Sequence, residues 1–399
     1  MKINLAKTIN FLLFICLSLF FMNNDRINLL CYIYIIISFI IFGVNIKNKG
    51  KVSIFILCIG LLLIVLLPII FILSDNGINN TLIVFVTLII SYLNFYDYNY
   101  NSVKQIDKID RVINIIITLR LIFNFIMSLM NSNSLINGLV LSSSIDKNYT
   151  GVIIFLFFNW SLKRKNWCGV IICLMYSLII QSRLLVIAII LMTILNLLFR
   201  IIEKSKFNIP RKFLNRLLDL KTFGIFNLTI IFTLIITIFS YVMVKFVNID
   251  SISDYQESLN DKSNAIRVRA NIYAIEDIKE NPSLILIGYD NNIRNVLGVT
   301  DNSTFYLGLR LVQPHNYLLN FFLRYGIILS LIYNIVLCNI LSKVWNRENL
   351  PFILTYLFMN MFMHSLLSTK YLVLFLYVLF IMHKNSNNND KFSVGNEVF

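Results

Sequence analysis

Long apolar runs separated by short polar stretches repeat along this chain, and they are its main structural signal. A bilayer-spanning helix needs about 20 mostly apolar residues. Because lipid offers the backbone no hydrogen-bond partners, such runs form helices, and here they lack the alternation typical of membrane strands. We therefore predict an all-α polytopic membrane protein, with residues 1–399 forming a single transmembrane domain of about twelve helices. The predicted spans are 8–24, 27–44, 52–73, 81–96, 112–130, 150–162, 168–181, 184–202, 223–247, 316–341, 352–368 and 371–383.

Composition supports the same class of protein. Of the 399 residues, 58% are hydrophobic and only 14% are charged, and the mean hydropathy is +0.76. A water-soluble domain of this length needs more polar residues to cover its surface. The first apolar run follows Met1-Lys2 without a small-residue cleavage site, so we expect a retained helix rather than a signal peptide.

The net charge of +15 raises the question of a nucleic-acid partner, but its distribution favours a membrane topology. Basic residues concentrate in alternate loops, and the short loops between these hold at most one each. This positive-inside pattern predicts cytoplasmic termini and inner loops that meet anionic membrane lipid, and it removes the need for nucleic acid. The inner-loop basic residues are Lys47, Lys49, Lys51, Lys104, Lys108, Arg111, Lys163, Arg164, Lys165, Arg200, Lys204, Lys206, Arg211, Lys212, Arg216, Lys221, Lys343 and Arg347.

The sequence predicts no metal site, cofactor or disulfide framework. All six cysteines lie in or beside apolar runs, and no Cys/His spacing typical of zinc is present. The acidic residues of the largest polar segment are scattered rather than clustered. An asparagine-rich stretch favours a disordered cytoplasmic tail over residues 384–399.

Residues 248–314 form the largest polar segment, and the charge pattern places it on the outer, periplasmic side. A long loop can be translocated whatever its charge. Ser263 is a suitable N-cap for a short amphipathic helix that Asn281-Pro282 would end. Arg267 and Asn271, four residues apart, would then line one edge of a groove over the membrane, or the helix would simply lie on the bilayer surface. The apolar face of this helix comprises Ile266, Ala270, Tyr273, Ala274 and Ile278.

His315 stands where this polar segment meets the next apolar run, in Gln313-Pro314-His315-Asn316-Tyr317-Leu318. Pro314 fixes the helix entry, and a neutral imidazole there can accept a proton from a sugar hydroxyl. Arg183 follows Gln181-Ser182 on the same predicted side, where it is either a phosphate-binding cation or an ordinary loop arginine. Arg120 and Arg324 fall within predicted spans, where a charge is costly and usually has a partner.

Three segments, in order, resemble the superfamily of O-antigen polymerases and O-antigen ligases. The first is Gln181-Ser182-Arg183 at the start of a long apolar span, and the second runs from Arg267 through Pro282 to Gly288. The third is Pro314-His315-Asn316-Tyr317-Leu318 through Tyr325-Gly326. The resemblance covers roughly residues 168–341. Arg324 stands where the family often has glutamate, and Gly288-Tyr289-Asp290 lacks a second glycine.

The resemblance implies a metal-independent glycosyltransferase of the bacterial inner membrane. Its donor would be an oligosaccharide on undecaprenyl diphosphate, a polyprenyl lipid, and a chain-length regulator is a further expected partner. His315 and Arg267 would be catalytic, with His315 orienting or deprotonating the acceptor hydroxyl. The diphosphate and sugars would be bound by Arg183, Arg267, Arg269, Arg310, Asn316 and Tyr317.

Two alternatives stay open beside an O-antigen polymerase in lipopolysaccharide biosynthesis. An O-antigen ligase would use the same residues to transfer a finished glycan to a lipid A core. A flippase for lipid-linked oligosaccharide would fit many spans and buried arginines, but it predicts charges along a central cavity between similar halves. The charges instead concentrate in 248–314, and the idiosyncratic sequence suits an enzyme specific for one repeat unit, so we favour the polymerase.

Overall fold

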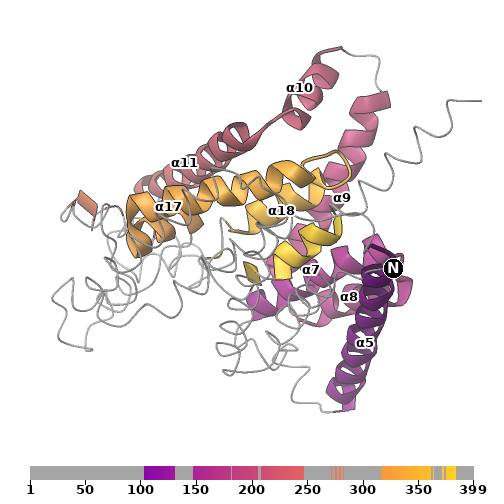
Figure 1. Cartoon of the computed structure of the whole chain (residues 1–399). Helices are drawn as coiled ribbons and strands as arrows, with labels where there is room; N and C mark the ends of the chain where they lie inside the picture. The colour runs from indigo at the N-terminus through magenta and orange to yellow at the C-terminus, as the bar shows by residue number, and fades with distance from the viewer. Residues whose placement is uncertain are drawn as a thin grey trace, which may run out of the picture.

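The computed structural model describes residues 103–130, 147–180, 182–204, 208–246 and 316–360, most of 371–382, and a few positions between 271 and 282. Every regular element within these residues is an α-helix. The helices are α5 (Val103–Met130), α7 (Lys147–Arg164), α8 (Trp167–Ile179), α9 (Arg183–Lys204), α10 (Asn208–Leu218), α11 (Thr222–Phe246), α17 (Tyr317–Val344) and α18 (Leu350–Asn360). A C-terminal helical segment comprises 371–372 and 374–382 (Figure 1).

Each predicted span from 112–130 onward overlaps a described helix or the C-terminal helical segment, although the second half of 352–368 lies almost entirely outside the described residues. The first four predicted spans lie outside the described residues, as do 248–270 and 384–399, so the count of about twelve remains a prediction. Two differences stand out. Helix α5 begins at Val103, nine residues before the apolar run, and α10 forms inside what we read as a polar inner loop.

Among the described residues, three helices are long and apolar enough to cross a membrane: α9, and the stretches Thr222–Phe239 of α11 and Gly326–Val344 of α17. Their outward faces are also apolar, as Ile190, Ile194 and Leu197 on α9 illustrate. A water-soluble protein rarely exposes large continuous apolar surface. The apolar helices therefore indicate a membrane protein, with lipid against these faces.

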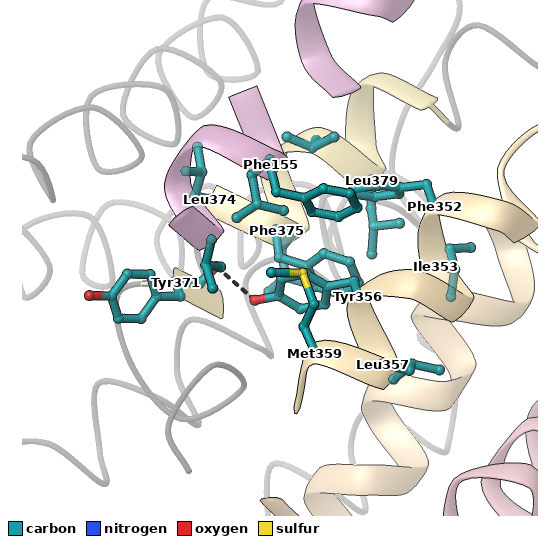
Figure 2. Close-up of a cluster of buried hydrophobic side chains, with 14 of the residues drawn as sticks. Phe155, Phe352, Ile353, Tyr356, Leu357, Met359, Tyr371, Leu374, Phe375 and Leu379 are labelled. Carbon is teal, nitrogen blue, oxygen red and sulfur yellow. Dashed lines mark hydrogen bonds between the residues drawn. The ribbon is translucent and has the colours of Figure 1, made fainter. Parts of the chain in front are cut away.

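The core lies where α7, α18 and the C-terminal helical segment meet. Phe155 of α7 packs against Phe352 of α18, which in turn packs against Phe375. The rings of Tyr356 and Phe375 stack with centroids 3.8 Å apart and planes 10° apart, and the Tyr356 hydroxyl donates to the Tyr371 carbonyl at 3.5 Å (Figure 2). Aromatic side chains bury large areas at low conformational cost, so this stack fixes α18 against the C-terminal helical segment.

Helices α7, α8 and α9 run back and forth through two tight connections. Lys165 adopts a left-handed backbone (φ 56°), and the Asn166 side chain then caps α8 by accepting from the Gly169 amide at 3.1 Å. At the far end, a Cβ on Gly151 would lie only 2.9 Å from the Ser182 hydroxyl oxygen. Helices α7 and α9 therefore begin at the same end of the bundle.

Helices α11 and α17 pack as an antiparallel pair (Figure 1). Asn316, at the start of α17, reaches Thr237 in the second half of α11. At the other end, the Asn339 amide donates to the Thr222 hydroxyl at 3.3 Å. Because α11 and α17 flank the polar segment, both its connections leave from the Asn316 end of this pair.

The opposite end of the bundle gathers the basic loops that the charge pattern placed together. Arg347, after α17, forms a two-pronged ion pair with Glu203 of α9. Lys163 of α7 lies 3.7 Å from Glu348, and the Trp345 indole donates to the Leu217 carbonyl at 2.8 Å. The last turns of α7, α9 and α10 and the residues after α17 therefore lie at one end of the bundle.

Candidate functional site

The start of α17 is held by the Asn316 side chain. Its backbone is extended (φ −131°, ψ 115°), and its Oδ1 caps the helix by accepting from the Leu319 amide at 3.4 Å. Its Nδ2 donates to the Thr233 carbonyl at 3.3 Å and to the Thr237 hydroxyl at 3.2 Å. All three contacts are buried or half-buried, so Asn316 fixes the point at which the chain enters α17 against α11.

Tyr317 follows directly and is almost fully buried. Its neighbours include Thr229 of α11 and Cys338 of α17. Farther along the helix, the rings of Phe321 and Tyr333 lie 4.4 Å apart. The first turns of α17 are therefore rigidly packed. A functional site immediately before Asn316 would need such a rigid helix to hold its side chains in place.

Gly326 divides α17 into two pieces, which we call the outer piece (residues 317–325) and the longer inner piece (residues 327–344). Its backbone (φ 73°, ψ 165°) is non-helical and lies in a region that glycine adopts far more readily than other residues. Such a break releases carbonyl and amide groups from the helical ladder within an otherwise apolar helix. Non-helical backbone at this depth is tolerated where it is buried in protein or lines a polar cavity.

The polar segment between α11 and α17 returns to the outer piece of α17. Ile278 and Leu319 both pack against Leu323, which is buried. The backbone is helical at Asn271, Ile275 and Ile278. The prediction of a helix there with Ile278 on its apolar face is confirmed at these positions, and a turn at Pro282 agrees with its predicted end. The other four residues of that face lie outside the described residues.

Buried polar side chains line α17 on either side of the break. Asn316 and Asn320 lie one turn apart in the outer piece, and Ser330 and Asn334 lie one turn apart in the inner piece. The Ser330 Oγ and the Asn334 Oδ1 make no hydrogen bond to protein. Unsatisfied buried polar atoms are costly, so these two mark a position where water or a polar ligand group would be favourable. Their four-residue spacing was the sequence signal that we overlooked.

Arg183 begins α9 and is exposed. The preceding Ser182 caps the helix, because its hydroxyl accepts from the Leu185 amide at 3.4 Å and donates to Asn148 Oδ1 at 3.2 Å. Arg183 therefore lies at the end of α9 remote from the Glu203–Arg347 ion pair. Arg120 is also exposed, on the face of α5 that carries apolar side chains.

Of the predicted site residues, the structure brings Asn316 and Tyr317 together and places Arg183 on a separate helix. His315, Arg267, Arg269 and Arg310 lie outside the described residues, and so does the side chain of Arg324. No group of three or more His, Cys, Asp or Glu side chains that could hold a metal ion occurs in the described part of the chain.

Sequence reasoning missed a buried ionic cluster that joins α5, α7 and the C-terminal helical segment. Asp110 is inaccessible to solvent and is ion-paired with Arg164. The Trp160 indole donates to Asp110 Oδ2 at 3.3 Å, and the Tyr377 hydroxyl donates to Oδ1. An acidic residue so close to an apolar run was the available signal, since buried carboxylates need a cation and donors.

A network of side-chain amides continues from this ionic cluster along α5. Asn166 Nδ2 donates to Asn114 Oδ1 at 2.7 Å and to the Thr118 hydroxyl at 2.9 Å. The Tyr176 hydroxyl donates to the Leu121 carbonyl at 3.0 Å. Side-chain hydrogen bonds of this kind stabilise helix packing in lipid, where hydrophobic burial gives little preference for one packing. We assign a structural role to this network.

No protein-family model, curated protein or solved structure matches this chain.

Proposed function

We propose that this chain is an O-antigen polymerase of the inner membrane, with about twelve spans, cytoplasmic termini and residues 248–314 in the periplasm. One observation carries the proposal furthest. Ile278, eleven residues after Arg267 in the sequence, packs against Leu323 in the part of α17 that follows His315. Histidine can act as the general base and arginine can stabilise the leaving diphosphate when a glycan is transferred from a diphosphate carrier.

In the proposed reaction, a hydroxyl oxygen of the acceptor sugar attacks the anomeric carbon of the donor glycan. The new glycosidic bond forms as the bond between that carbon and the diphosphate oxygen breaks. The hydroxyl proton passes to the His315 imidazole, and the electron pair leaves with the polyprenyl diphosphate. Arg267, aided by Arg183, Arg269 and Arg310, would stabilise the charge that develops on the diphosphate.

The side-chain contacts of Asn316 give it a positioning role in this proposal. Both ends of its amide are occupied by Leu319, Thr233 and Thr237. It is therefore suited to fix the preceding His315 rather than to bind sugar. Tyr317, buried against α11, would act in the same way.

A flippase is the second candidate, and the broken α17 is the observation that favours it. A helix break with the buried polar atoms of Ser330 and Asn334 below it resembles the discontinuous helices of transporters. A ligase would use the polymerase residues with a different acceptor. The glycan that accumulates when the gene is deleted differs among the polymerase, the ligase and the flippase, so it distinguishes the three functions.

The test is a surface-polysaccharide gel from the source strain after deletion of this gene. The deletion strain is complemented with wild type, with His315→Ala or with the control His383→Ala. His383 is the last residue of the final predicted span, on the predicted cytoplasmic side and away from His315. A polymerase predicts that the deletion leaves the core with a single repeat unit. Wild type and His383→Ala restore the ladder, and His315→Ala does not, although it reaches normal membrane levels.

Other results would redirect or reject the proposal. Long polymer left on the carrier lipid with no core-linked sugar indicates a ligase. Repeat units trapped on the cytoplasmic leaflet indicate a flippase. An unchanged ladder after deletion rejects all three functions, and a full ladder with His315→Ala rejects the proposed catalytic residue.

A further inference from the structure

Helix α10 (Asn208–Leu218) stands at one extremity of the molecule, between α9 and α11 (Figure 1). Both neighbours are candidate membrane spans, one ending at Lys204 and the other beginning at Thr222. Residues 205–207 connect α9 to α10, so the first residue of α10 lies within about 15 Å of the last residue of α9. The connections therefore keep α10 close to the boundary where these two spans leave the bilayer.

Only part of the apolar side of α10 is covered by protein. Leu214 is buried, and Leu217 and Leu218 pack against the core. Ile209 and Phe213, one turn apart, are 83% and 66% exposed. Phe213 and Leu217 are also one turn apart, so Ile209, Phe213 and Leu217 form one row along the helix. Leu217 is covered by the bundle, whereas Ile209 and Phe213 are not. They form an uncovered apolar strip at the level of the membrane boundary.

A basic row borders this strip on its other side. Lys212 and Arg216 are both exposed, and each lies three residues after a member of the strip, Ile209 or Phe213. Residues three apart are neighbours on a helix surface. Of the nearby acids, Glu203 is already paired with Arg347, and the single Asp219 after α10 is outnumbered by Arg211, Lys212, Arg216 and Lys221. An exposed apolar strip flanked by cations is the arrangement by which a helix lies in an anionic bilayer interface.

We propose that α10 is a binding surface for anionic phospholipid. Ile209 and Phe213 insert among the acyl chains, and Lys212 and Arg216 bind the headgroup phosphates. The surface lies at the end of the bundle that carries the basic loops, where anionic lipid is attracted electrostatically. This inference does not depend on the proposed polymerase activity.

The test uses the full-length chain purified in a neutral detergent. Its melting temperature is followed while phosphatidylglycerol, phosphatidylcholine or glycerol phosphate is added. We expect phosphatidylglycerol to raise the melting temperature most, and high salt to weaken this effect. For the double variant Lys212→Gln/Arg216→Gln, roughly 30-fold more phosphatidylglycerol should be needed for the half-maximal shift, since each cation contributes about fivefold.

The control is Lys165→Gln/Lys204→Gln, which removes two exposed lysines at the same end of the bundle but outside α10. It should respond to phosphatidylglycerol within about twofold of wild type. Phe213→Ser should weaken the response with both cations still present. If the double variant does not fold, the single variant Lys212→Gln should still show the fivefold effect.

Three results would overturn the proposal. An equal loss in the control would mean that only the total charge matters. An equal shift with phosphatidylcholine would mean that the headgroup charge plays no part. A full effect of glycerol phosphate alone would mean that the apolar strip binds nothing and that α10 is a site for soluble anions.

Discussion

The Tyr377 hydroxyl donates a hydrogen bond to the Asp110 carboxylate across 267 residues of sequence. The same carboxylate is ion-paired with Arg164 and accepts from Trp160. Asp110 is inaccessible to solvent, and the Arg164 side chain is only 4% exposed. One carboxylate therefore ties the start of α5 to the end of α7 and to the C-terminal helical segment. In the apolar interior these contacts fix which helices meet.

Replacing one residue of this cluster should destabilise the protein, and the loss should be larger when a buried charge is left without its partner. Asp110→Ala leaves the Arg164 guanidinium buried without its carboxylate, so we expect a loss of about 3–5 kcal/mol. Tyr377→Phe removes one hydrogen bond to a charged group and should cost about 1.5–3 kcal/mol. Unfolding of the purified protein in a denaturing detergent would measure both. Equal costs for the two variants would contradict the view that the buried charge dominates.

The apolar helices among the described residues could be predicted from the sequence. Long apolar runs dominate the chain, and in lipid such runs have few alternatives to a helix. The Arg347–Glu203 pair brings the end of α9 close to the residues after α17, and the topology drawn from the charges stays a prediction. The end of the amphipathic helix at Pro282 and the placement of Ile278 also agree with the pattern.

What could not be predicted depends on contacts between distant residues. Nothing near Asp110 in the sequence reveals that Tyr377 lies beside it, because helix packing in lipid is specified by side-chain fit. Helix α10 was missed because its many basic residues lower its average hydropathy, although Ile209, Phe213, Leu214 and Leu217 recur at helical spacing. The break at Gly326 was missed because a single glycine within a long, mostly apolar run is often tolerated in a continuous helix.

Lys163 offers a test of an ion pair that contributes little. Burial lowers the pKa of the Lys163 ammonium, and the opposing effect of Glu348 is weaker. Glu348 is 63% exposed, so solvent screens the pair. We expect Lys163→Met to change the free energy of unfolding by less than about 1 kcal/mol, because it also removes the cost of burying a charge. A large loss of stability would show that the pair is stronger than its exposure implies.

The same residue gives a pH dependence with a definite sign. The lowered pKa of Lys163 means that the unfolded chain binds more protons at this position than the folded chain does. Its contribution to stability should therefore rise with pH from the lowered pKa up to the ordinary value of 10.5. Comparing wild type with Lys163→Met across this alkaline window isolates the contribution. A difference that stays flat or falls as the pH rises would contradict the assignment.

Asn316 should be more sensitive to replacement than an ordinary helix cap. Asn316→Ala removes the cap and the donor to the Thr237 hydroxyl, which still donates to the Thr233 carbonyl, so we expect a loss of about 2 kcal/mol. Asn316→Asp keeps the capping acceptor but sets a carboxylate against the Thr233 carbonyl, and it should lose activity as well. Thr237→Val provides a double-mutant cycle for the Nδ2 contact. An additive cycle would mean that the hydrogen bond to Thr237 contributes nothing.

A substitution at Gly326 can test the effect of the backbone conformation of α17 separately from the effect of side-chain packing. The φ of 73° at this glycine costs a residue with a Cβ roughly 1–2 kcal/mol, so Gly326→Ala should favour a continuous α17. Straightening the helix would move its outer piece, and with it Asn316 and Ile278, relative to the inner piece. In complemented cells we expect a shortened polysaccharide ladder at near-normal membrane levels. Gly224→Ala is the control, because that glycine is helical and its added Cβ meets chiefly the flexible Leu220 side chain. If both variants behave alike, the break at Gly326 has no functional part; if only Gly326→Ala fails, the position of the outer piece is what activity requires.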